Sequence, residues 1–188
     1  MSYLKYDPDS KRIKGREALI KYRKALQENQ KWDGEIPLGE GPLNRDGNPT
    51  VPPGQKVVEH WPVLDLGLQP DLPLANWNLT ISGLVKKPTT FTWDQFMDLP
   101  QVEDISDFHC VTTWSRLNNH WKGVRFRDIA EYCGVLPSAN HVFIKAYDSY
   151  TTNLPLDSAM KYDVMLVHSW EGNPLTKEHG GPLRMITP

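Results

Sequence analysis

Short strand-like and short helix-like stretches alternate along most of this chain, which leaves few fold classes open to it. Trp77, Leu79 and Ile81 alternate with polar residues, as in a strand with one buried face. Residues 163–167 are mostly apolar, which predicts a central strand. Long helices of the kind found in doubly wound folds are not predicted between these strands. The pattern therefore predicts an α+β fold, with mixed sheets and short helices.

The helix signals are local and specific. Thr92 is followed three residues later by Gln95, the pattern of a capping box, and Pro100 ends the short helix that it begins. A second short helix is predicted for residues 127–133, with Gly134 at its C-terminal end. Further strands are predicted around Val124 and Phe126 and over residues 141–146.

The N-terminal part of the chain differs from the rest. Residues 10–30 are basic and carry a loose apolar face, which predicts a helix that Ser10 caps. Residues 32–55 are rich in Gly and Pro and show the period of neither helix nor strand, so we expect an extended arm stiffened by proline. We therefore divide the chain into an N-terminal helix and arm, residues 1–56, and one domain, residues 57–188.

Composition narrows the function classes. The formal net charge of -2 gives no general attraction to nucleic acid or acidic membranes. No stretch approaches the roughly 18 consecutive apolar residues of a membrane span, and the first residues lack the apolar core of a signal peptide. The chain has two cysteines, Cys110 and Cys133, too few for a disulfide framework. We expect reduced thiols in a cytoplasmic protein, with no nucleic-acid or membrane partner.

The segment around Cys110 is the first candidate for chemistry. A predicted strand runs into Cys110, and polar residues and a tryptophan follow it. The thiol could be a nucleophile, a metal ligand or a buried small hydrophobe. His109 is poorly placed to deprotonate it, because neighbouring side chains on a strand point to opposite faces. Cys133 lies on the predicted buried side of a short helix, where a structural role is expected.

A second candidate is the segment over residues 176–184. Gly180 and Gly181 would let the backbone approach a ligand closely, as in phosphate-binding loops, and Arg184 could give a phosphate two parallel hydrogen bonds. An ordinary turn before a strand is the alternative. The other histidines have no metal-ligand spacing among themselves.

Taken together, these segments resemble the sulfite-oxidase-like molybdopterin oxidoreductases, especially the small bacterial branch without a haem domain. The resemblance covers about residues 57–188, and its segments come in the family's order. They are PVLDLG at residues 62–67, WNLTISG at 77–83, FHCVTTWS at 108–115, WKGVRFRD at 121–128, YTTNLPL at 150–156 and HGGPLR at 179–184.

The resemblance implies an α+β fold of the sulfite-oxidase type and one pyranopterin dithiolene cofactor, molybdopterin, holding a single molybdenum. It makes Cys110 the thiolate ligand of the metal, a soft ligand suited to that role. It places His179 and Arg184 against the pterin and its phosphate, and Asp65 at the family's acidic position. His109, Ala146, Tyr150 and Thr151 would line the same pocket.

The implied function is transfer of an oxygen atom to or from a small oxyanion or sulfoxide, such as sulfite. Arg116 could attract an anionic substrate by its charge, and a separate protein would exchange electrons with the site. Two alternatives stay open: a shortened interaction domain that holds little cofactor, and a cofactor-free thiol enzyme. Family members normally continue beyond the proline that follows the Leu-Arg motif, and this sequence ends at Pro188, so we expect this form to bind cofactor poorly and to have little activity.

Overall fold

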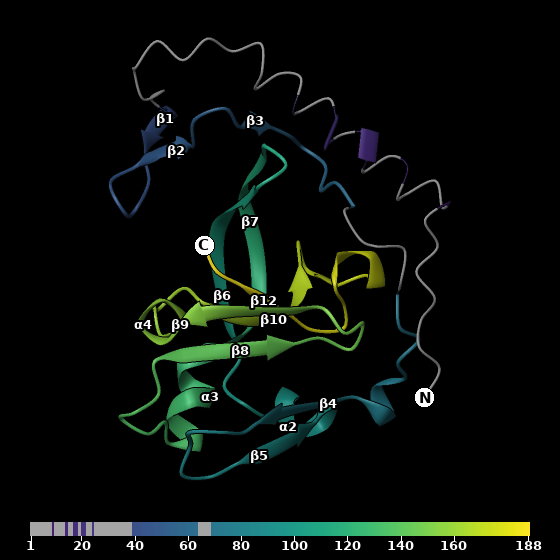
Figure 1. Cartoon of the computed structure of the whole chain (residues 1–188), viewed down its shortest axis with the longest axis vertical. Helices are drawn as coiled ribbons and strands as arrows, with labels where there is room; N and C mark the ends of the chain where they lie inside the picture. Colours follow the sequence, from purple (N-terminus) through teal and green to yellow (C-terminus); the bar gives the residue numbers. More distant parts are fainter. Residues whose placement is uncertain are drawn as a thin grey trace.

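The computed structural model of the protein describes residues 39–63 and 69–188, together with a few single positions between residues 9 and 24. The helix predicted for residues 10–30 therefore falls largely outside the described residues. Within the described ranges, mixed sheets combine with short helices, which confirms the α+β prediction (Figure 1). No helix in this part of the chain is both long and apolar enough to cross a bilayer.

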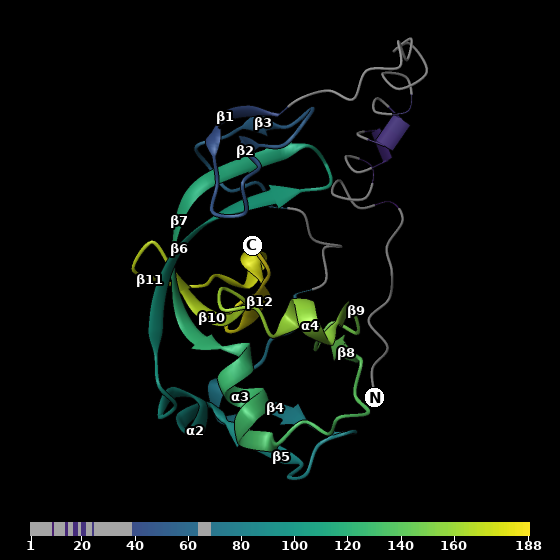
Figure 2. The same ribbon diagram turned by 90° about the vertical axis from the view of Figure 1, so that its left-hand side faces the viewer.

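A long antiparallel hairpin, β6 (Val102–Cys110) and β7 (Trp114–Arg125), forms the spine of the molecule (Figure 2). Thr113 has a φ of 68° in the connecting turn, and its amide donates to the Cys110 carbonyl at 2.8 Å. The register shifts where Asn118, with a φ of 53°, adds a residue to β7. A bulge of this kind bends a strand pair, and Figure 2 shows the hairpin curving along its length.

On the edge of β7 that faces away from β6, two further strands pair with it. β10 (Met165–Trp170) is antiparallel to the end of β7, and β3 (Lys56–Val57) is parallel to its start. β11 (Asn173–Pro174) and β12 (Arg184–Ile186) both pair with β10. Since β10 lies inside the sheet and is mostly buried, the prediction of a central apolar strand is confirmed, with its bounds moved a few residues along the chain.

A smaller layer lies below this sheet in Figures 1 and 2. It holds the hairpin of β4 (Asn78–Ile81) and β5 (Thr89–Thr92), the turn η1 (Leu74–Asn76) and helix α2 (Trp93–Met97). The capping box is confirmed: the Gln95 amide donates to the Thr92 hydroxyl at 3.3 Å, and the Thr92 amide donates to Gln95 Oε1 at 3.0 Å.

Helix α3 (Phe126–Cys133) follows β7 directly and ends at Gly134, whose φ of 67° suits a left-handed cap. The expectation that Phe126 continues a strand is wrong: its amide donates to the Val164 carbonyl at 2.9 Å, and its ring is buried against the next helix. That helix is α4 (Leu156–Ala159), which follows the hairpin of β8 (His141–Lys145) and β9 (Thr151–Pro155). Cys133 is fully buried, as expected for a structural thiol.

The described part of the arm is more regular than its composition predicts. β1 (Glu40–Leu43) and β2 (Pro49–Val51) form a short hairpin, which corrects the expectation of an extended arm without regular structure. The Asn44 side chain closes its turn by accepting hydrogen bonds from the amides of Asp46 and Asn48, both at 3.0 Å. β3 then carries the arm onto the start of β7, near the tip of the β6–β7 hairpin.

Candidate functional site

Cys110 lies at the last position of β6, half-buried at the tip of the long hairpin. Its Sγ is 3.1 Å from Oγ1 of Thr112. Gln55, from the arm, donates through Nε2 to the Cys110 carbonyl at 3.1 Å. The residue that carries the thiol is therefore held by both the hairpin turn and the arm.

His109 does not pair with the Cys110 thiol. Its Nδ1 lies 2.8 Å from the hydroxyl of Ser115, which in turn donates to Gln55 Oε1 at 3.4 Å. Among the described residues no hydrogen bond joins the imidazole to Sγ of Cys110, as strand geometry predicts. The thiol-enzyme alternative thus has no base at hand in this part of the chain.

His179 and Arg184 come from one tight loop. Its helical turn η2 (Lys177–His179) ends at Gly180, with a φ of 86°, and the Gly181–Pro182 peptide is cis. A Cβ at Gly181 would lie 2.1 Å from the Leu175 carbonyl oxygen, so only glycine fits there. Across this loop, Nη1 of Arg184 donates to the His179 carbonyl at 2.8 Å.

An aromatic cluster joins this loop to β6. The His179 ring lies 4.2 Å from the ring of Trp61, and its Nε2 is 3.2 Å from the Trp61 carbonyl oxygen. The guanidinium of Arg184 lies over Trp61 and Phe108, 5.0 and 5.4 Å from their ring centroids. Cys110 packs on the edge of the same cluster. Two segments about seventy positions apart, those of Cys110 and Arg184, therefore meet around Trp61.

Arg184 is a partly buried cation within this cluster. The side chain as a whole is half-buried, but its Nε is buried and has no hydrogen-bond partner among the described residues. Burial lowers the pKa of Arg184 to about 10, and the negative charge of a Cys110 thiolate acts in the opposite direction. The guanidinium is thus a cation at neutral pH, desolvated and within electrostatic reach of the thiol.

A cavity of about 220 Å³ lies beside Arg184, between β6 and the end of the chain. Ser106, His109 and Trp121 line it as well. The Ser106 hydroxyl and the Trp121 indole nitrogen are buried without a hydrogen-bond partner in the described structure. Unpaired buried polar groups are costly, and with Nε of Arg184 three such groups belong to residues that line this cavity.

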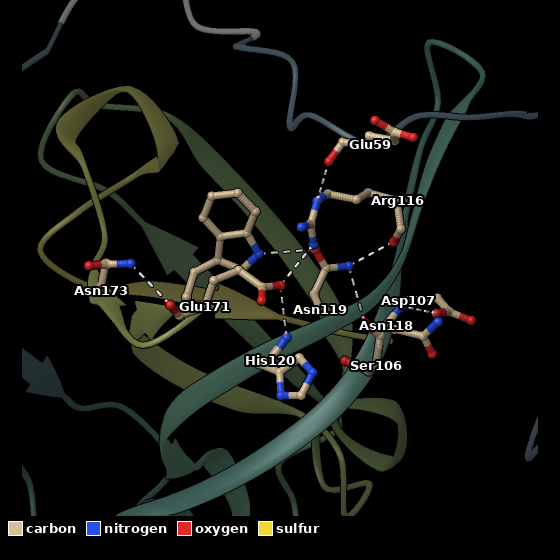
Figure 3. Close-up of polar contacts among 10 residues, drawn as sticks. Glu59, Ser106, Asp107, Arg116, Asn118, Asn119, His120, Glu171 and Asn173 are labelled. Atoms are coloured by element: carbon tan, nitrogen blue, oxygen red, sulfur yellow. Dashed lines mark hydrogen bonds and ion pairs between the residues drawn. The ribbon is translucent and has the colours of Figure 1, made fainter.

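Arg116 is held away from this cavity. Its Nε donates to the Glu59 carbonyl at 2.9 Å, and its Nη1 binds Asn119 and, at 3.0 Å, the carboxylate of Glu171 (Figure 3). Its guanidinium also faces the Trp170 ring at 4.6 Å. The predicted role for Arg116, attraction of substrate, stays a prediction that these contacts do not favour.

The remaining predicted residues are only partly brought together. Ala146, Tyr150 and Thr151 share the β8–β9 hairpin, where the Ala146 amide donates to the Tyr150 carbonyl at 2.9 Å. No hydrogen bond in the described structure joins these three to Cys110 or Arg184. Asp65 lies outside the described residues.

Sequence reasoning missed several residues of the site. They are Gln55, Trp61, Ser106 and Trp121. Trp61 stands in a short loop with no periodic pattern, so its central place depends on contacts with residues far along the chain. Two of them had a signal in the sequence: Gln55 lies in the arm close before β3, and Trp121 begins the WKGVRFRD segment of the resemblance.

Comparisons with known proteins identify the family of the chain. The family model described as "Oxidoreductase molybdopterin binding domain" matches residues 67–188. The uncharacterized oxidoreductase YuiH of Bacillus subtilis is 43% identical over 147 residues, covering 76% of this chain and 73% of that protein. A putative protein-methionine-sulfoxide reductase subunit, YedZ1 of Azospira oryzae, is 30% identical over 118 residues, covering 63% of this chain and 45% of its own length.

Among solved structures, the sulfane dehydrogenase SoxCD of Paracoccus pantotrophus shares the fold, with a TM-score of 0.59 and 22% identity. The match covers 85% of this chain and 45% of that one. This likeness confirms the fold class, and the family match confirms molybdopterin as the cofactor. The chain therefore belongs to the sulfite-oxidase-like molybdopterin oxidoreductases, a family of enzymes.

Proposed function

We propose that this domain moves an oxygen atom to or from a small substrate, such as sulfite or a sulfoxide, with Cys110 as the protein's ligand to molybdenum. The observation that carries the proposal is the meeting of the Cys110 thiol and the Arg184 guanidinium at one aromatic cluster around Trp61. A thiolate suits the soft metal of such a cofactor as a ligand, and a buried cation suits its phosphate.

The residues present fit such a cofactor. The thiol of Cys110 is half-buried at a strand end rather than lost in the core, so a metal could reach it. The unpartnered Nε of Arg184, with Ser106 and Trp121, offers donors to an anionic or polar group. When bound, the cofactor supplies the two-electron oxygen-transfer chemistry, and the protein supplies orientation and charge.

The chain's own groups have separate tasks in this proposal. Cys110 loses its proton on ligation, and the turn amide of Thr113 with the Gln55 amide holds its backbone. Arg184 offsets the negative charge of the thiolate and of the phosphate. His179, hydrogen-bonded to Thr176 at 3.0 Å, presents its loop beside them.

We extend the proposal to the pocket residues that the resemblance implies: Asp65, His109, Ala146, Tyr150 and Thr151 would line the cofactor or substrate side. His109 lines the cavity beside Arg184, which supports its place. The division into residues 1–56 and 57–188 stands as a proposal, with β3 crossing its boundary.

One relative supports a sulfoxide as substrate, because its printed name is that of a putative protein-methionine-sulfoxide reductase subunit. Reduction of a sulfoxide releases its oxygen as water and consumes two protons and two electrons. Since that relative is named a subunit, we propose that a separate protein delivers or removes the electrons. The unpaired state of Cys110 and Cys133 supports a cytoplasmic location.

The test is to produce the chain in a host that makes molybdopterin, and to measure molybdenum and pterin per protein. Two assays follow: sulfite with ferricyanide as acceptor, and an aryl methyl sulfoxide with a reduced viologen dye as donor. We expect molybdenum and pterin to be present in the purified protein, at low occupancy if this form binds cofactor poorly, and turnover per bound molybdenum in one assay. A chain without molybdenum, or a loaded chain inactive in both assays, would contradict the proposal.

A further inference from the structure

We propose that Arg116, Asn119 and Glu171 are positioning residues that fix the indole of Trp170, and through it the loop that carries His179. This inference rests on the proposed function, because the loop matters only if it helps to hold the cofactor. It assigns Arg116 a role different from contact with substrate.

Asn119 is the centre of the network. The residue is 1% exposed, and both ends of its side-chain amide are used (Figure 3). Nδ2 donates to the carbonyls of Ser106 at 3.1 Å and of Arg116 at 2.7 Å. Oδ1 accepts from Nη1 of Arg116 and from the indole of Trp170 at 3.0 Å. One buried amide therefore ties β6, β7 and β10 together just below the Cys110 hairpin tip.

Arg116 fixes the same indole from its face. Its guanidinium carbon lies 4.6 Å from the Trp170 ring centroid, while its side chain is only 17% exposed. A planar guanidinium both stacks on an indole and donates in its own plane, which a lysine cannot do. The face of the Arg116 guanidinium thus contacts Trp170, and its N–H groups donate to Glu59 and Glu171.

Trp170 connects this network to the residues around Trp61. Its ring lies 5.0 Å from Trp61 in an edge-on arrangement and 5.9 Å from the ring of His179. Trp61 in turn packs on both His179 and Arg184. A shift of the indole would therefore move the surface on which His179 and Arg184 rest.

Glu171 gives independent evidence that the network has a role beyond the turn between β10 and β11, because a glutamate does not suit that turn. Trp170 pairs with Asn173 across a two-residue connection, in which Glu171 has a φ of 49° and Gly172 a φ of 76°. Such turns favour Asn-Gly, because asparagine tolerates positive φ better than glutamate does. Glutamate offers instead a carboxylate that accepts from Arg116 at 3.0 Å and from the His120 amide at 3.3 Å.

Because glutamate suits the turn poorly but binds Arg116, the variant Glu171→Asn separates the two effects. It suits the turn and removes the carboxylate from Arg116. We expect its melting temperature to equal or exceed that of the wild type. We also expect molybdenum to be lost during dialysis about five to ten times faster, as the loss of one partly buried contact of Arg116 implies. In protein without cofactor, the near-ultraviolet circular dichroism of the tryptophan cluster should change as well.

Two variants serve as controls. Glu103→Gln removes another acid that pairs with a basic residue of β7, Lys122, at 3.2 Å, and should leave molybdenum retention unchanged. Glu171→Gln keeps an acceptor oxygen of the same reach and should recover part of the retention. Equal retention and unchanged dichroism in Glu171→Asn would overturn the proposal. A melting temperature lowered enough to explain the whole faster loss of molybdenum would also overturn it, because the network would then contribute to stability alone.

The outcomes separate the two proposals. Wild-type protein without molybdenum overturns the proposed function and this inference with it. Loaded wild-type protein whose Glu171→Asn variant behaves identically overturns only the inference.

Discussion

The guanidinium carbon of Arg184 lies 5.0 Å from the centroid of the Trp61 ring, on the face of the cluster that also carries Phe108. The stack fixes the plane of the guanidinium while leaving its Nε without a partner in the described structure. A cation held in this way is prepared to bind an anion at little further cost in entropy.

Replacing Arg184 with alanine should lower cofactor occupancy but not turnover per bound molybdenum. A charged hydrogen bond to phosphate contributes about 1.5–3 kcal/mol, so affinity should fall by roughly one to two orders of magnitude. Arg184→Lys keeps the charge and loses the planar stack, so it should recover only part of the affinity. Metal analysis set beside activity per molybdenum makes the measurement, and unchanged occupancy in Arg184→Ala would contradict it.

The two cysteines should respond differently to substitution. Cys110→Ser replaces the soft thiolate by a hard oxygen ligand, and should abolish activity and change the electron paramagnetic resonance spectrum of the metal. Cys133→Ala leaves a small cavity in a fully buried site, and should lower the free energy of unfolding by about 1 kcal/mol while leaving the spectrum intact. Equal spectral changes in both variants would show that Cys110 is not the ligand.

Gly123→Ala should destabilise the central sheet strongly. A Cβ at this position would lie 2.1 Å from the Leu166 carbonyl oxygen and 2.6 Å from Cα of Val167, so the backbones of β7 and β10 must separate. We expect a loss of about 2–4 kcal/mol in the free energy of unfolding, measured by urea titration. Gly54 has open space around it and a φ of 70°, so Gly54→Ala should cost only about 1–2 kcal/mol of backbone strain.

His168 should make stability depend on pH. Burial, and secondarily the charge of Lys122, lowers the pKa of His168 in the folded state. The unfolded chain therefore binds the proton first, and the free energy of unfolding should fall as pH drops from about 6.5 through the lower folded-state pKa. His168→Gln should flatten this part of the curve. An unchanged slope in that variant would assign the pH dependence to another group.

Local signals in the sequence predicted local structure well. The Thr92 and Gln95 capping box and the cap at Gly134 are confirmed, because each depends on residues within one helical turn. The strand that runs into Cys110 is confirmed as well, and it ends where the chain turns into β7.

Long-range contacts account for what the sequence did not predict. Phe126 was expected in a strand, yet contacts with Val164 and α4 place it in a helix. Attraction of an anionic substrate by Arg116 stays a prediction; what the sequence did not indicate is its contact with Glu171, fifty-five positions away. No local period encodes such a pair, and the same holds for Trp61, whose neighbours come from β6, β10 and the His179 loop.

The parallel pairing of β3 with β7 also bears on aggregation. Beside β3, the edge of β7 is covered by Arg116, which binds the Glu59 carbonyl, and by the Glu171 amide, which donates to the His120 carbonyl at 2.9 Å. β10 covers the edge from Trp121 onward. The arm thus covers this edge of β7 and keeps it from pairing with other chains, as exposed strand edges readily do. Deleting residues 52–58 would uncover backbone donors and acceptors next to Cys110, and should favour dimers and larger species joined edge to edge.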